Sequence, residues 1–114
     1  MIDQPPAFVC HVTAVSDGDT FHCQERPVRV RLKDIDAPEI HGCRKGRICA
    51  PGDGYASKAA LTRILASGTV HCVQYGTDRY RRPLVRCRVN GQDIGQTMLS
   101  TGYAVTWPYR GKGR

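Results

Sequence analysis

The sequence predicts an α+β fold that is mainly β: a small, closed or partly closed five-stranded barrel with two helices against it. The chain has 114 residues, of which 40% are hydrophobic and 24% charged, a composition that suits one globular domain and excludes disorder. Its apolar segments alternate with the two-residue period of half-buried strands. These segments follow the order three strands, helix, two strands, helix, without a repeat or linker. We therefore expect a single domain over residues 1–114.

Three strands are expected in the first part of the chain. Residues 8–15 form an apolar run that ends in the turn-forming sequence Ser-Asp-Gly-Asp at 16–19, and a second strand follows over 20–25. Residues 28–32 alternate apolar with basic side chains, as a half-buried strand does. Ile35 continues this run, and Pro38 ends it.

A long loop and a helix come next. Residues 40–54 hold four glycines and several basic residues, and loops of this length in compact domains are usually functional or mobile. Asp53 is a suitable N-cap for a helix over 55–65, which places three alanines, an isoleucine and a leucine on one face.

The remaining segments complete the barrel. Residues 69–74 and 84–89 are predicted to be strands. Asn90-Gly91 forms a turn, and Asp93 caps a short helix over 94–100 that Gly102 ends.

The charge balance points to a polyanionic partner. Seventeen Lys and Arg residues against ten Asp and Glu give a net charge of +7, and such a basic domain most often binds nucleic acid. No apolar run approaches the roughly 18 residues of a membrane span, so we expect no membrane association. The N-terminus lacks the features of a signal peptide.

Four carboxylates, Asp17, Asp19, Asp36 and Glu39, fall at turns or strand ends. If these ends converge, Asp19 and Asp36 supply hard oxygen ligands, which together with a backbone carbonyl suit Ca²⁺ or Mg²⁺. Glu39 is then placed beside the metal, where it can take a proton from water. The alternative is that the first pair only forms a turn and Asp36 is a surface acid.

Two arginines favour the metal-site hypothesis. Arg31 precedes Asp36 on the same strand, and Arg82 ends a basic run. A guanidinium group can hold two phosphate oxygens and neutralise the charge that grows on phosphorus. Metal, base and two guanidinium groups together predict a phosphodiesterase.

Four blocks of sequence resemble the staphylococcal nuclease-like (thermonuclease) family. In order they are Asp-Gly-Asp-Thr at 17–20, Arg-Leu-x-x-Ile-Asp-Ala-Pro-Glu at 31–39, Asp-Arg-Tyr-x-Arg at 78–82 and Thr-Gly-Tyr-Ala at 101–104. The similarity covers a core of about residues 8–104 and leaves a basic tail at 110–114. The resemblance implies a five-stranded barrel of the oligonucleotide-binding (OB) type, and Ca²⁺-dependent hydrolysis of phosphodiester bonds in DNA and RNA.

The resemblance also implies a metal site and a base. Asp19 and Asp36 match the family's calcium carboxylates, and Ala37 takes the place of a backbone carbonyl ligand that commonly comes from Thr. Glu39 matches the general base.

The substrate contacts follow from the same blocks. Arg31 and Arg82 match the two arginines that bind the phosphate, and Tyr80 matches an aromatic residue beside the nucleotide pocket. Tyr109 is assigned to a nucleotide-contacting tyrosine. Arg81 stands where the family usually has Gly, a residue that permits positive φ, and the C-terminal helix of the type member has no counterpart.

The expected activity is that of a nuclease with low sequence specificity, because its contacts are to phosphate and sugar. Arg44, Lys45 and Arg47 in the loop after Glu39 are candidates to steer the nucleic acid. The alternative is a non-catalytic OB-fold module that binds single strands. We expect a monomer in either case.

Six cysteines allow two interpretations. Cys10, Cys23, Cys72 and Cys87 share the alternation of the buried strand residues, so we expect four free, buried thiols. Cys43 and Cys49 flank the basic loop and are candidates for a local disulfide, which favours a secreted or periplasmic protein. Zinc ligation by this pair with His41 is a minor alternative, since no fourth ligand is evident.

Overall fold

The computed structural model describes residues 6–43 and 45–109. Arg44 and the basic tail at 110–114 lie outside the described residues. The strands, in chain order, are β1 (Ala7–Cys10), β2 (Val12–Asp17), β3 (Thr20–Cys23), β4 (Val30–Leu32), β5 (Ile35–Asp36), β6 (Val70–Thr77), β7 (Pro83–Val89), β8 (Gln92–Asp93) and β9 (Val105–Thr106). The helices are α1 (Gly54–Leu65) and α2 (Ile94–Ser100).

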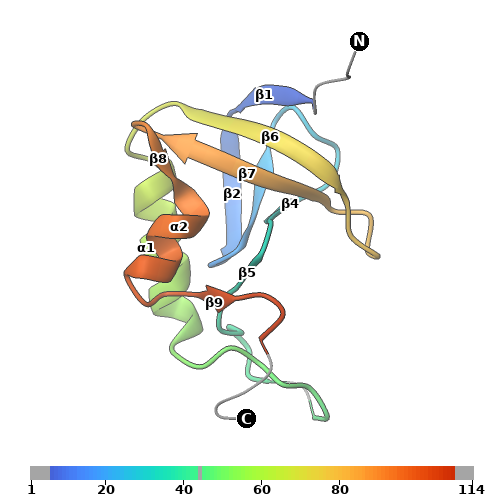
Figure 1. Ribbon diagram of the computed structural model, residues 1–114, viewed down its shortest axis with the longest axis vertical. Coiled ribbons are helices and arrows are strands. Elements are labelled where there is room, and N and C mark those ends of the chain that lie inside the picture. Colours follow the sequence, from blue (N-terminus) through green and yellow to red (C-terminus); the bar gives the residue numbers. More distant parts are fainter. Residues whose placement is uncertain (1–5, 44, 110–114) are drawn as a thin grey trace.

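One strongly curled sheet forms the body of the molecule, and Figure 1 shows how it bends around the interior. Its strand order is β1-β6-β7-β4-β3-β2, with β8 added beside β7, and only the β4–β7 pair is parallel. The two edge strands β1 and β2 are consecutive in the chain and separated by His11 alone. A single bent segment therefore closes one side of the barrel.

The expected fold class is confirmed. The predicted strand over 8–15 is β1 and β2 together, and the other four predicted strands correspond to β3, β4, β6 and β7. The break at His11 arises because its N–H donates 2.9 Å to the side chain of Glu25 instead of to a neighbouring strand. Short strands that periodicity does not reveal are β5 and β9, which pair with each other, and β8.

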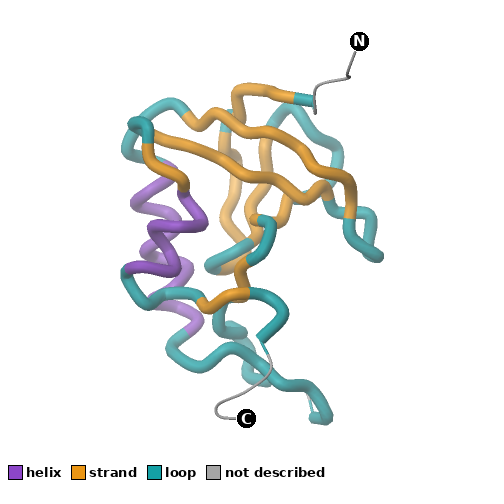
Figure 2. Tube along the Cα trace, in the orientation of Figure 1, coloured by secondary structure: helices purple, strands orange, loops and turns teal. Residues whose placement is uncertain are grey.

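Both helices lie on the same side of the curled sheet (Figure 2). The Asp53 side chain caps α1 by accepting from the backbone N–H groups of Tyr55 and Ala56. The Asp93 side chain caps α2 by accepting from the N–H of Gln96. Both N-caps are as predicted. The largest side chains enclosed between helices and sheet are Phe21, Leu32, Ile35, Leu61, Ile94 and Met98.

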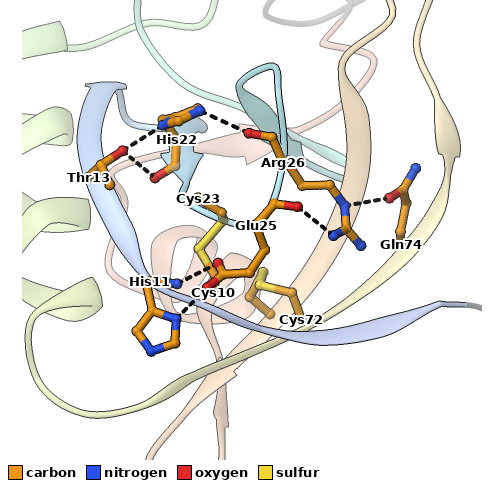
Figure 3. The surroundings of a disulfide bond; sticks show 10 residues. Cys10, His11, Thr13, His22, Cys23, Glu25, Arg26, Cys72 and Gln74 are labelled. Atoms are coloured by element: carbon orange, nitrogen blue, oxygen red, sulfur yellow. Dashed lines mark hydrogen bonds and ion pairs between the residues drawn. A yellow bond between two sulfur atoms is a disulfide. The ribbon is translucent and has the colours of Figure 1, made fainter.

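The prediction of four free thiols is wrong. Cys10 bonds to Cys23, and Cys72 bonds to Cys87, so both pairs are disulfides. Burial alternates in the same way for a thiol and for a half-cystine, and pairing depends on register, which places Cys72 directly opposite Cys87. Figure 3 shows the Cys10–Cys23 bond between the bend at His11 and the end of β3.

A third disulfide joins Cys43 to Cys49 in the loop before α1, and no free cysteine is present in the described part of the chain. Zinc ligation by these two cysteines is thereby excluded. Three disulfides in a chain of this size indicate an oxidising compartment. Within residues 6–43 and 45–109, neither helix has the length and hydropathy needed to cross a bilayer.

Candidate functional site

The candidate site begins with two carboxylates that face one arginine. Asp19 and Asp36 are both buried, at 3% and 6% exposure. Arg31 Nη1 lies 2.9 Å from Asp19 Oδ2, and its Nη2 lies 3.9 Å from Asp36 Oδ1. The same Nη2 donates 3.0 Å to the Ile35 carbonyl. The convergence of acids from two separate strand ends, which the sequence analysis could only assume, is present.

Backbone packing holds Asp19 in place. A Cβ on Gly18 would lie 1.8 Å from Ser57 Oγ on α1 and 2.8 Å from Ala37 Cβ, so only glycine permits this turn to lie against the helix. Asp19 Oδ2 accepts 2.9 Å from the Ala37 N–H, and Oδ1 accepts 2.8 Å from the Thr20 hydroxyl. The Asp-Gly-Asp-Thr sequence thus positions a carboxylate and is more than a turn.

Burial and the crowding of like charges raise two pKa values here. Burial and then the neighbouring Asp19 carboxylate raise the pKa of Asp17 to about 7. Burial raises the pKa of Asp36, and the Asp19 carboxylate adds to the rise, while Arg31 opposes it. Asp17, Asp19 and Asp36 therefore lie close together, and Arg31 is the cation that contacts Asp19 and lies near Asp36.

Glu39 lies one step further along the chain, at the start of the long loop. Its Oε2 is 3.6 Å from Nη2 of Arg47, which belongs to the segment that the Cys43–Cys49 disulfide closes. A Cβ on Gly54 would lie 2.4 Å from the Glu39 carbonyl oxygen, so the start of α1 packs directly on the Glu39 backbone. The helix therefore fixes the backbone that carries this acid.

Arg82 is held by Asp78 at the β6–β7 turn. The Asp78 Oδ2 accepts 2.7 Å from Arg82 Nε, and its Oδ1 accepts from the backbone N–H groups of Tyr80 and Arg82. Burial raises the pKa of Asp78, but these hydrogen bonds outweigh burial and leave it below the usual value. Arg81 has a φ of 67°, so this turn keeps the left-handed conformation that glycine usually supplies.

These elements border an open cleft of about 800 Å³. The residues that line it are Arg31, Lys33, Asp34, Arg47, Asp78, Arg79, Tyr80, Arg82, Leu84 and Trp107. Five arginine or lysine side chains among them surround two exposed aromatic rings, those of Tyr80 and Trp107. Cation and aromatic surface together suit a nucleotide.

The structure gathers most, but not all, of the predicted residues. Arg31, Arg47, Tyr80 and Arg82 line the cleft, whereas Asp19, Asp36, Ala37 and Glu39 lie behind Arg31 and Arg47. Within the described residues, Lys45 and Tyr109 are not among those that line it.

Sequence reasoning gave no role in the site to six residues that line this cleft: Lys33, Asp34, Asp78, Arg79, Leu84 and Trp107. Asp78 was visible in its motif but had no assigned role, although it positions Arg82. Lys33 follows Leu32 on the way to the acids. Trp107, two residues before Tyr109, enters the cleft because its N–H donates 2.9 Å to the Asp34 carbonyl. Only its position close to the predicted tyrosine signalled it.

The carboxylate oxygens of Asp19 and Asp36 are of the type that binds a hard divalent cation, but the two residues differ in how many of their oxygens are already engaged. Asp19 already accepts three hydrogen bonds or ion-pair contacts, while the described contacts of Asp36 leave its oxygens available. Within the described ranges no group of three His, Cys, Asp or Glu side chains could hold a metal ion. Two carboxylates with a backbone carbonyl and water are the set that calcium accepts.

Comparison with known proteins gives the family. The family described as staphylococcal nuclease homologue matches residues 29–113, which include Arg31, Asp36, Glu39 and Arg82 but not Asp19. An uncharacterized endonuclease from Haemophilus influenzae is 33% identical over 104 residues, 89% of this chain and 52% of that protein. Protein ParB from Escherichia coli is 32% identical over 114 residues, 90% of this chain and 58% of ParB.

The chain thus spans about half the length of the curated relatives it matches. The family match, in contrast, covers most of the chain, and the curled sheet with its two helices agrees with the OB-like fold of that family. The chain therefore belongs to the staphylococcal nuclease homologue family.

Proposed function

We propose that this domain is a calcium-dependent nuclease that hydrolyses phosphodiester bonds of DNA and RNA with low sequence specificity. The observation that carries the proposal is the position of Arg31, which contacts Asp19 and lies near Asp36 while it also lines a cleft with Arg82. Membership of a nuclease family and similarity to an endonuclease support it.

Asp19, Asp36 and the Ala37 carbonyl would hold Ca²⁺. When bound, the ion supplies charge neutralisation and a fixed point for one phosphate oxygen. The domain's own side chains do the remaining work. Arg31 and Arg82 line the cleft and turn to the other phosphate oxygens the N–H groups that Asp19, Ile35 and Asp78 do not use, and they neutralise the charge that develops on the phosphorus.

Glu39 takes the proton from the attacking water. The water oxygen forms a bond to phosphorus, the bond from phosphorus to the leaving sugar oxygen breaks, and that oxygen takes a proton from solvent. Arg47 contacts Glu39 and so places a cation beside this carboxylate. Tyr80 and Trp107 offer ring faces to the bases on either side of the phosphate.

Low sequence specificity follows from the kind of contact. Cations directed at phosphates carry no information about sequence, and stacking on an aromatic ring accepts every base. Lys45 and Tyr109 do not line the cleft, so any contact they make is outside it. Arg44 lies outside the described residues.

The test is incubation of supercoiled plasmid and of a labelled single-stranded oligonucleotide with the protein and Ca²⁺, followed by excess chelator. We expect both substrates to be cut and the cutting to stop on chelation. Salt-sensitive retention without cleavage would instead support the alternative, a non-catalytic single-strand binding module. Cleavage that persists at full rate in chelator would contradict the calcium requirement.

The three disulfides favour a secreted or periplasmic location for this activity. Thiol alkylation of the protein in intact cells, before lysis, tests this. We expect no alkylated cysteine unless reductant is added first. Six alkylated cysteines in untreated cells would contradict it.

A further inference from the structure

A row of outward-facing side chains, two of them arginines, runs from the cleft along β7. Its alternate residues Leu84, Arg86 and Arg88 point away from the core: Arg86 and Arg88 are exposed, whereas Val85 and Cys87 between them are fully buried. We call Leu84, Arg86 and Arg88 the outer row.

The outer row begins in the cleft itself. Leu84 lines the cleft and lies directly opposite Arg31, because β4 pairs with β7 at these residues. Arg86 is ion-paired with Asp34, which also lines the cleft. Successive members of the row are about 7 Å apart, twice the rise per residue of a strand. A strand of nucleic acid that leaves Arg31 in this direction passes Leu84 and then meets the cations Arg86 and Arg88 in turn.

The surroundings of the outer row add an aromatic surface and few acids. The Arg86 guanidinium lies 5.8 Å from the centroid of the exposed Tyr75 ring on β6. Exposed His71 lies opposite Arg88 in the register. Asp93, which also pairs with Arg88, is occupied as the N-cap of α2. Asp34 is ion-paired with Arg86 and therefore competes with a phosphate for this guanidinium. A bound phosphate would replace Asp34 there.

We propose that the outer row is a binding track for the single strand of nucleic acid that extends beyond the scissile phosphate. Arg86 and Arg88 bind successive phosphates, and Tyr75 offers a ring to a base. A single strand fits better than a duplex, because the cations form one line beside an aromatic ring. The identity of the ligand rests on the proposed function, whereas the location of the track rests on the geometry of β7.

Binding as a function of strand length tests the track. Fluorescence anisotropy in chelator, which prevents cleavage, measures the dissociation constants of a labelled dinucleotide and a labelled 20-nucleotide strand. The variant is Arg86→Gln with Arg88→Gln. The matched control, Lys58→Gln with Arg63→Gln, removes the same charge from α1, on the helical side of the barrel.

We expect the double variant to reduce the preference for the long strand over the dinucleotide by about tenfold at low salt. The slope of log affinity against log salt for the long strand should fall by about 1.4, since each released phosphate contact contributes about 0.7 in a single strand. The control should leave both quantities unchanged.

An equal loss of affinity for both lengths, or an equal loss in the control, would overturn the track. So would a duplex that depends on Arg86 and Arg88 more strongly than the single strand does. If the wild type shows the length preference but cuts nothing with Ca²⁺, the track stands and the nuclease proposal fails. If it cuts both substrates and the double variant binds normally, the nuclease proposal stands and the track fails.

Discussion

The β2–β3 hairpin carries polar clusters at both ends, and the two clusters differ in burial. At the turn, Asp19 is 3% exposed and is held by Arg31, Thr20 and the Ala37 backbone. At the open end, Glu25 accepts from His11 at an exposed position, and the His11 backbone hydrogen bond lowers its pKa. Figure 3 shows this second cluster beside the Cys10–Cys23 bond.

The comparison teaches that burial of charge, and not the presence of acids and bases, distinguishes the candidate site. Exposed ion pairs contribute little to stability and perturb the chain little. Buried carboxylates have a high energetic cost and persist only where the surrounding structure compensates them. At the turn end, Arg31 offsets the cost of the buried Asp19 carboxylate. At the open end, Glu25 is exposed and no such cost arises.

The largest effect is expected at Asp19. Asp19→Ala leaves Arg31, whose side chain is only 15% exposed, without its closest carboxylate partner, so we expect a loss of about 3–5 kcal/mol in the free energy of unfolding. Cleavage should be abolished as well. Urea denaturation and the plasmid assay measure the two effects. A stability loss under about 1 kcal/mol would show that the Asp19–Arg31 pair contributes no more to stability than an exposed ion pair such as that of Glu25 with His11.

At Arg82 the expected effect is on rate. Arg82→Lys keeps the charge but loses the planar fork, so we expect kcat to fall by about 10²–10³-fold with a small change in stability. Arg63→Lys on α1 is the matched control. The measurement is initial rate against substrate concentration. A fall in affinity with unchanged kcat would place Arg82 in ground-state binding instead.

Removal of the disulfide at the open end sharpens the comparison. Cys10→Ser with Cys23→Ser opens a link between residues 13 apart, and we expect unfolding to become easier by about 3 kcal/mol. Because this bond is remote from the cleft, cleavage well below the melting temperature should stay near the parental rate. Lost cleavage in a folded variant would mean that the two ends are coupled.

The smallest effect concerns Asp78 and pH. Its pKa is lowered in the folded state from an ordinary value of 3.8, so its contribution to stability is complete above that value and disappears as the pH falls through the folded pKa. Denaturation midpoints of the wild type and of Asp78→Asn should therefore converge below about pH 4. A constant difference at all pH values would contradict the assignment.

Much of the fold is predictable because burial alternates along the strands, and because the N-caps Asp53 and Asp93 can be recognised from the local sequence. The break at His11 is not, because it depends on a side chain that reaches back from Glu25, fourteen residues away. Disulfide pairing is likewise invisible without register, as Cys72 and Cys87 show.

The candidate site divides in the same way. Asp19, Arg31 and Asp36 are recognisable because their motifs fix the strand ends that carry them. Trp107 is not, since it reaches the cleft only when the C-terminal segment returns along β5 and its N–H meets the Asp34 carbonyl. Such residues are placed by contacts between segments that are distant in the sequence, and not by local conformational preference.

The most direct test makes the same substitution at Glu39, in the candidate site, and at Glu25, at the open end of the β2–β3 hairpin. Initial rates of Ca²⁺-dependent cleavage are measured for Glu39→Gln and Glu25→Gln, with melting temperatures as a check on folding. We predict a fall of about 10²–10⁴-fold for Glu39→Gln, the loss of a general base, and the parental rate for Glu25→Gln. Equal rates in the two folded variants would contradict the assignment of Glu39 and of the cleft.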